Sequence, residues 1–179
     1  NYSSMNAGKS TMLLQANHNY SERGMNAQLY TSALDNRFGN DEITSRIGLK
    51  KKSNIFTKDT NIFEEIALKH KTLFVDCLLI DEAQFLTKKQ VEQLGKIVDK
   101  LEIPVLAFGI RTDFQGNLFE GRKFLLAWAD NLKEINTVCH CGRKATMVLR
   151  INDQGKVIED GAQIEIGGED KYVSVCRKH

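Results

Sequence analysis

The sequence of 179 residues has no apolar run long enough to cross a membrane. Its longest apolar runs, residues 77–80 and 124–129, are far shorter than the roughly 18 to 20 residues that a spanning helix needs. The sequence also lacks an excess of either charge, because 25 Lys and Arg residues balance 23 Asp and Glu residues, leaving +2. Proteins that bind nucleic acid through many phosphate contacts are usually far more basic. The short apolar runs argue against a membrane-bound protein, and the near-neutral charge favours a small-molecule partner.

Cysteine and proline are also scarce, with four residues and one residue respectively. No secretory signal is recognisable at the start of the sequence, so we expect a cytosolic protein whose thiols stay reduced. In such a protein, clustered cysteines indicate a metal site or catalysis before disulfides. Three cysteines lie near the C-terminus, at Cys139, Cys141 and Cys176. Cys77 lies inside an apolar run and is expected to be a buried hydrophobic side chain.

Apolar, β-prone runs alternate with helical patterns through the first three quarters of the sequence. The expected strands lie at residues 27–30, 77–80 and 104–108. One helix is expected over residues 10–23, closed by Gly24, and another from a capping box at 87–90 to about residue 100. This alternation predicts an α/β domain with a mostly parallel sheet. The polar segment 40–58 shows no period and is predicted to be a mobile loop.

From residue 135 onward the pattern changes to short strand-like runs separated by turn signals. These runs lie at residues 146–151, 163–166 and 172–175. They predict a second, smaller β unit that begins near residue 136. We therefore expect an α/β domain over residues 1–135, which contains the candidate nucleotide-binding motifs described next, and a small domain over residues 136–179.

The stretch MNAGKS at residues 5–10 contains most of a Walker A motif, GxxxxGK[ST], with Ser3 in place of the first Gly. Gly8 allows backbone N–H groups to turn toward an anion, and Lys9 can reach the β- and γ-phosphates of a nucleotide. The Ser10 hydroxyl can ligate Mg²⁺. The alternative is a helix start in which Gly and Lys are incidental.

Asp81 and Glu82 follow the apolar run 78–80. Such a pattern predicts a central strand that delivers two carboxylates to the edge of the sheet where ligands bind. In such a pair the first acid typically holds Mg²⁺, and the second can act as a general base. A solvated strand end is the alternative, but the phosphate-loop motif at Lys9 favours a nucleotide site.

The C-terminal region contains a CxC pair, Cys139 and Cys141, and a CxxH pair, Cys176 and His179. Four such ligands suit a closed, structural, tetrahedral Zn²⁺ site. His140 is an alternative to His179 as the fourth ligand. A unit without metal is the alternative interpretation, although so small a β unit would then have little core of its own.

Taken together, these motifs resemble the type II thymidine kinases, the family of cellular and many bacterial deoxythymidine kinases. The resemblance runs nearly from end to end and is closest to the bacterial branch. It rests on the stretches MNAGKST, YTSALDNRFG, SRIGL, LLIDEAQFLT, GIRTDFQGNLF, CHCGRKA and IGGEDKYVSVCRKH. The family pattern has an apolar strand before the phosphate loop and usually continues past residue 179, so we expect both ends here to be incomplete.

The resemblance implies a P-loop core of the RecA-like kind and a small zinc-binding β domain with a lasso loop over the substrate. It implies transfer of the γ-phosphate of MgATP to the 5′-hydroxyl of deoxythymidine, giving dTMP and ADP for nucleoside salvage and DNA synthesis. The implied cofactors are Mg²⁺ and structural Zn²⁺. The implied assembly is a cytoplasmic homotetramer, with dTTP as a candidate feedback inhibitor and neither nucleic acid nor membrane as a partner.

The resemblance also implies roles for individual residues. Glu82 would be the catalytic base, and Asp81 and Ser10 would support Mg²⁺. The residues implied at ATP and its phosphates are Ser3, Ser4, Met5, Asn6, Ala7, Gly8, Lys9, Ser10, Thr11, Asp35 and Arg37. Those implied at the nucleoside are Met5, Gln84, Phe85, Ile110, Phe114, Phe119, Gln163, Ile164, Glu165, Ile166, Gly167 and Tyr172.

From residue types alone, the apolar members of the nucleoside set would be ordinary core residues. Loop backbone can recognise a pyrimidine without any diagnostic side chain. Two rival functions share parts of the pattern. One is a P-loop ATPase in which Glu82 activates water. The other is a zinc-knuckle nucleic-acid binder that would use Arg143, Lys144, Arg150, Arg177 and Lys178.

Overall fold

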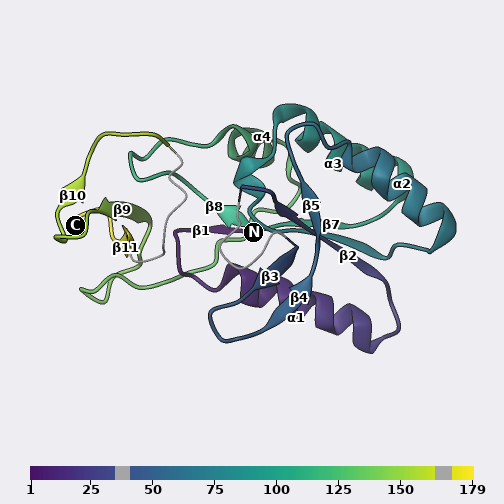
Figure 1. The fold of residues 1–179 in the computed structure, drawn as a ribbon, viewed down its shortest axis with the longest axis horizontal. Coiled ribbons are helices and arrows are strands. Elements are labelled where there is room, and N and C mark those ends of the chain that lie inside the picture. Colours follow the sequence, from purple (N-terminus) through teal and green to yellow (C-terminus); the bar gives the residue numbers. More distant parts are fainter. Residues whose placement is uncertain (35–40, 164–170) are drawn as a thin grey trace.

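The computed structural model describes residues 1–34, 41–163 and 171–179. The elements form two groups along the long axis of the molecule, a larger α/β group and a small sheet that contains the C-terminus (Figure 1). Within the described residues, no helix is long and apolar enough to cross a membrane.

The main sheet has four parallel strands in the order β5-β2-β6-β7. These strands are β5 (Asn54–Phe56), β2 (Ala27–Ser32), β6 (Cys77–Ile80) and β7 (Val105–Ala107). β1 (Tyr2–Ser3) and β8 (Gly109–Ile110) form a separate parallel pair, and β8 follows β7 in the chain after a single residue. The three strands expected from the sequence are all present, and the prediction of an α/β fold with a mostly parallel sheet is confirmed.

Helices cover both faces of this sheet. α1 (Lys9–Glu22) lies on one side, whereas α2 (Ile62–Thr72), α3 (Lys88–Leu101) and α4 (Glu120–Trp128) lie on the other (Figure 1). Alternate residues of β6 separate accordingly: Leu78 and Ile80 pack in the cluster with α2 and α3, and Cys77 and Leu79 pack in the cluster with α1. Cys77 is fully buried, as predicted. Burial on both faces explains why this strand is apolar throughout.

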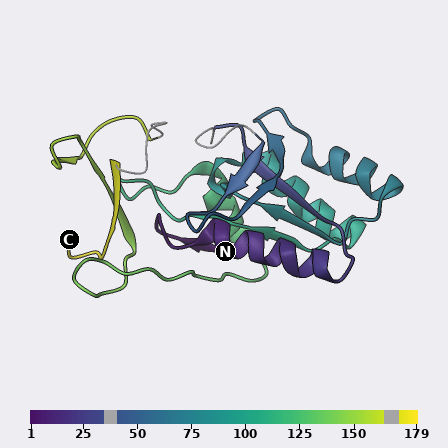
Figure 2. The same cartoon turned by 60° about the horizontal axis from the view of Figure 1, so that its bottom comes forward.

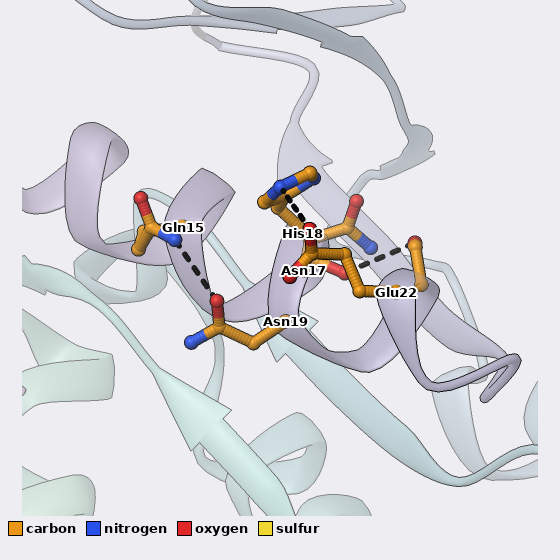
Figure 3. A network of polar contacts seen from close by, with 6 residues as sticks. Gln15, Asn17, His18, Asn19 and Glu22 are labelled. Carbon is orange, nitrogen blue, oxygen red and sulfur yellow. Dashed lines mark hydrogen bonds and ion pairs between the residues drawn. The ribbon is translucent and has the colours of Figure 1, made fainter.

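The two predicted helices begin where their sequence signals indicate. Thr87 and Gln90 form a capping box that starts α3. α1 has a polar outer face on which Gln15 donates to Asn19 and His18 pairs with Glu22, over 2.9 Å and 3.3 Å (Figure 3). These contacts join residues four positions apart, the spacing that brings side chains together on one helix face.

The prediction of a mobile loop over residues 40–58 is wrong for its described part, residues 41–58. β3 (Glu42–Thr44) and β4 (Lys50–Lys52) form an antiparallel hairpin, and β5 joins the main sheet beside β2. Ile43 is buried against α1 and Phe56 is buried on the opposite face. Strands of three residues are too short to show a hydrophobic period, so these two burials left no signal in the sequence.

The small sheet is antiparallel, with the strand order β10-β9-β11. Its strands are β9 (Met147–Ile151), β10 (Val157–Ile158) and β11 (Tyr172–Val175). The expected strands at 146–151 and 172–175 are therefore present. Of the run 163–166, Gln163 lies outside any strand and the rest lies outside the described residues. Figure 2 shows this sheet at one end of the molecule, apart from the helices.

The turn η1 (Ala83–Phe85) follows β6 and packs tightly against α4. A Cβ atom added at Gly121, in the first turn of α4, would lie 2.5 Å from the Leu86 carbonyl oxygen and 2.9 Å from that of Ala83. Because these contacts are with backbone, no side-chain rotation can relieve them. Gly121 therefore allows the close approach of α4 to the turn that follows Glu82.

Gly121→Ala is expected to destabilise the protein by about 1–3 kcal/mol, the usual cost of overpacking. Thermal unfolding would measure this as a fall in Tm of roughly 2–4 °C per kcal/mol for a chain of this size. Gly95→Ala is the matched control, because a Cβ at this position in α3 meets no atom within 4 Å. It should raise Tm slightly through helix propensity. Equal Tm values for the two variants would contradict the proposed role of Gly121.

Candidate active site

A cavity of about 350 Å³ lies where the phosphate-loop residues, the end of β6 and the small sheet meet. It collects most of the described residues that the sequence assigned to ATP or the nucleoside. These are Met5, Asn6, Ala7, Gly8, Lys9, Ser10, Thr11, Asp81, Glu82, Gln84, Phe85, Ile110, Phe114, Phe119, Gln163 and Tyr172.

Two of the remaining predicted residues, Ser3 and Ser4, are buried at the start of the phosphate loop and do not line the cavity. Six others fall outside the described residues: Asp35, Arg37, Ile164, Glu165, Ile166 and Gly167. The lining also includes residues that the sequence did not assign, chiefly 42–47 of the β3–β4 hairpin, Asp113 and Val148. The SRIGL stretch contributed to the family resemblance, but it had no assigned role.

The phosphate loop runs from Ser3 into α1. Gly8 is the N-cap of α1 and has a left-handed backbone with φ 82°, which favours glycine. The Lys9 amine is buried and donates to the Ser3 hydroxyl at 3.1 Å and to the Ser4 carbonyl at 2.9 Å. In the described structure no acidic residue lies in the first turn of α1, and no side chain caps it. The helix start therefore offers N–H groups to an anion.

Asp81 is buried directly beside this helix start. Its carboxylate accepts from the Ser10 hydroxyl at 2.9 Å and from the Glu82 backbone N–H at 3.0 Å. Burial, then the charge of Glu82, raise the pKa of Asp81 to about 7, although the bonds from Glu82 N–H and Ser10 and the charge of Lys9 oppose this. Ser10 and Asp81 together present a hydroxyl and a carboxylate, the oxygen ligands that Mg²⁺ prefers.

Glu82 is held from both its backbone and its side chain. Its backbone is left-handed, with φ 50°, and its carboxylate accepts a hydrogen bond from the Gln84 amide. The side-chain amide oxygen of Gln84 in turn accepts from the Ile110 backbone N–H at 3.1 Å. The backbone carbonyl of Ile110 accepts from the Arg122 Nε at 3.0 Å. Gln84 was predicted to contact the nucleoside, and the structure adds a contact with Glu82, the predicted catalytic base.

Aromatic side chains form one wall of the cavity. Phe85 and Phe119 pack edge to face, with ring centroids 5.8 Å apart. The Phe114 ring is buried and stacks with the Arg150 guanidinium at 5.2 Å. Gln163 donates to the Asp113 carboxylate at 2.8 Å. An apolar, flat-sided wall with a few polar groups at its margin suits a planar ring ligand.

The small sheet closes the cavity beside the phosphate loop. Tyr172 of β11 and Val148 of β9 line the cavity. The Ser174 hydroxyl donates to the Met5 carbonyl at 2.6 Å, and the Ser4 hydroxyl donates to the Ala145 carbonyl at 3.4 Å. These two bonds join the phosphate loop directly to β11 and to Ala145, which lies just before β9.

Cys139, Cys141, Cys176 and His179 form one cluster, with all their ligand atoms within 4.8 Å of one another. The Cys141 and Cys176 sulfurs are 3.8 Å apart, and the His179 Nδ1 lies 3.4 Å from the Cys139 sulfur. A tetrahedral site with Zn–S bonds of about 2.3 Å has ligand separations of about 3.8 Å. The donor set and its spacing therefore fit zinc.

Two further features describe this cluster. The backbone N–H of Cys141, assisted by His179 and other neighbours and opposed by burial, lowers the pKa of the Cys139 thiol to about 5. Despite the bond from the Arg143 N–H, burial and the contacts with Cys139 and Cys176 raise the pKa of the Cys141 thiol, so the thiolate is favoured at Cys139 in particular. The His140 ring stacks on the His179 ring with centroids 4.5 Å apart, and the cluster of four does not include it. The geometry favours His179 over His140 as the fourth ligand.

Comparison with known proteins gives consistent matches over the whole chain. The family model described as thymidine kinase matches residues 1–179. A thymidine kinase of Haemophilus influenzae (strain Rd) is 61% identical over 99% of this chain and 92% of its own length. Thymidine kinases of Pasteurella multocida and Vibrio parahaemolyticus are 60% and 57% identical, each over 99% of this chain and 93% of its own length.

Proposed function

The chain belongs to the thymidine kinase family, and we propose that it transfers the γ-phosphate of ATP to the 5′-hydroxyl of deoxythymidine, giving dTMP and ADP. One observation supports this most directly: the phosphate loop, Glu82 and the aromatic wall share a single cavity. A phosphoryl donor and a flat nucleoside base could therefore meet within it. The core would be a P-loop fold of the RecA-like kind.

The phosphate end of the cavity is suited to hold ATP. The N–H groups at the start of α1 would bind phosphate oxygens, and the Lys9 amine would move from Ser3 and Ser4 to the β- and γ-phosphates. Ser10 and Asp81 would hold Mg²⁺, directly or through its water shell. When bound, this ion would neutralise charge on the phosphates during transfer.

The nucleoside end of the cavity contains Glu82, the proposed general base. Glu82 lines the cavity, and the Gln84 amide holds one of its carboxylate oxygens. The carboxylate would accept the proton of the 5′-hydroxyl as this hydroxyl attacks the γ-phosphate. Phe85, Phe114 and Phe119 would enclose the thymine ring. Burying its methyl group would contribute only about 1–3 kcal/mol, so deoxyuridine is expected to be a poorer but real substrate.

The small unit would complete the site. Residues 136–179 would form a domain held by structural Zn²⁺ at Cys139, Cys141, Cys176 and His179. The segment 133–135 pairs with β1, which supports a boundary after residue 135. A lasso over the base, a homotetramer, feedback inhibition by dTTP and a cytoplasmic setting are proposals that rest on the family resemblance.

Three measurements separate this proposal from its rivals. In the first, the protein is mixed with MgATP and a panel of nucleosides, and monophosphate products are measured. Formation of dTMP supports the kinase. Steady ATP hydrolysis that is independent of nucleoside would indicate the ATPase in which Glu82 activates water. Oligonucleotide binding that weakens steeply with salt would indicate the nucleic-acid binder.

Lys9→Ala is expected to lower kcat/KM for ATP by about 10- to 100-fold, the range for losing one hydrogen-bonding charged partner. The Lys9 amine lies at the start of α1, beside the expected phosphates, so kcat should fall together with ATP affinity. Steady-state kinetics with varied ATP would measure both. Lys96→Ala, on the exposed surface of α3, is the matched control. Wild-type kinetics for Lys9→Ala would refute the phosphate-loop assignment.

A further inference from the structure

Strand β11 and the residue that follows it serve three different parts of the molecule. Tyr172 lines the cavity. Ser174, two residues on and therefore on the same face, donates to the phosphate loop at Met5. Cys176, directly after the strand, belongs to the metal cluster. A single five-residue segment thus connects the nucleoside end of the cavity, the phosphate loop and the metal cluster.

The Met5 carbonyl needs a donor for a physical reason. A loop that turns its N–H groups toward an anion turns carbonyl oxygens away from it, and these oxygens need their own partners. The next residue, Asn6, has a left-handed backbone with φ 61°, a conformation that only glycine and a few polar residues such as Asn adopt readily. The bond from Ser174 holds the peptide that precedes this turn.

The position of Ser174 is determined by the small sheet. In the register of β11 and β9, Ser174 lies opposite Val148, and Val175 lies opposite Met147. Val175 also packs in the small core that contains Cys139 and Cys176. In both views the start of α1 faces the small sheet (Figures 1 and 2). Displacement of the metal cluster would therefore move the donor that holds the phosphate loop.

We propose that Ser174 is a positioning residue for the phosphate loop, through which the small unit controls ATP binding. The inference rests on the proposed function, since it concerns how the same site binds its phosphoryl donor. The buried bond from Ser4 to the Ala145 carbonyl is a second, longer connection between the same two parts. The small unit thus acts on the phosphate end of the cavity as well as on the nucleoside end.

Ser174→Ala tests this directly in the whole protein. Calorimetric titration with MgATP, without nucleoside, should give a Kd about 5- to 30-fold higher than the wild-type value, because the partly buried Met5 carbonyl loses its donor. The KM for ATP should rise by a similar factor. The KM for deoxythymidine and the zinc content should stay within about twofold of wild type, since Tyr172 and the metal cluster are unchanged.

Two variants serve as controls. Ser174→Thr keeps the hydroxyl and suits a strand, so it should bind MgATP within about threefold of wild type. Val173→Ala changes an exposed neighbour on the other face and should bind MgATP as wild type does. Wild-type MgATP affinity in Ser174→Ala would overturn the proposal. An equal rise in both KM values together with loss of zinc would also overturn it, since Ser174 would then act through folding.

The same measurements distinguish this proposal from the proposed function. A wild-type protein that binds MgATP but forms no dTMP would refute the kinase reaction. The titration of Ser174→Ala with MgATP would still decide the role of Ser174, because it requires no nucleoside and no turnover.

Discussion

Glu82→Gln is expected to lower kcat by about 10²- to 10⁴-fold, the usual contribution of a positioned general base. The substitution keeps the shape of the side chain and removes its basic oxygen. Affinity for ATP and deoxythymidine should change little, because Lys9, the start of α1 and the aromatic wall are intact. Single-turnover measurement of dTMP formation would isolate the chemical step from product release.

Asp81→Asn is the informative comparison for this prediction. Asp81 accepts from Ser10, whereas Glu82 accepts from Gln84, so the two carboxylates contact different parts of the site. Asp81→Asn should weaken Mg²⁺-dependent ATP binding, which Glu82→Gln should not do. Phosphoryl transfer through a loose transition state gains little from a general base, because the attacking hydroxyl loses its proton late. A kcat of Glu82→Gln within a few-fold of the wild-type value would therefore refute the role of Glu82 as general base and leave the kinase assignment intact.

Cys141→Ser is expected to abolish stoichiometric zinc binding and to unfold the small unit. Among its described residues, the buried hydrophobic cluster of this unit has four members, two of them proposed metal ligands. Structural zinc contributes folding free energy directly, about 10–16 kcal/mol in zinc-finger peptides. Because the unfolded unit would also displace Tyr172 and Ser174, dTMP formation should fall by about 100-fold or more. Metal analysis, limited proteolysis and the kinase assay would measure these effects.

Cys77→Ser is the matched control for the metal analysis. Cys77 is fully buried in β6, far along the chain from the cluster, and its substitution should leave the zinc content unchanged. A Cys141→Ser protein that retained one zinc ion per chain and wild-type activity would contradict the proposed metal site.

The sequence predicted the larger fold well where elements are long or their ends are marked. β6 has the predicted bounds because a continuous apolar run ends at two carboxylates. α3 begins at its capping box because Thr87 and Gln90 bond locally. The β3–β4 hairpin was missed because its stability comes from one buried residue, Ile43, that packs against a helix distant in sequence. Such tertiary burial has no local pattern.

The candidate site was predicted less evenly. Lys9, Ser10, Asp81 and Glu82 were found because phosphate chemistry demands particular residue types at fixed spacing. The apolar wall at Phe85, Phe114 and Phe119 came from the family resemblance, since its residue types alone indicate ordinary core. The bond from Ser174 to the Met5 carbonyl had no sequence signal. Any side chain with a hydroxyl can meet any backbone carbonyl, so only the folded structure brings the two together.

The alternation along β11 also constrains how this protein can diverge. Deleting or inserting one residue within the strand would reverse the faces of the residues on one side of the change relative to those on the other. Tyr172, Ser174 and Cys176 would then no longer reach the cavity, the phosphate loop and the metal cluster at the same time. By contrast, the turn 152–155 between β9 and β10 contributes no residue to the cavity lining or to the described metal cluster. Length variation among related sequences should therefore accumulate in that turn and be absent from β11.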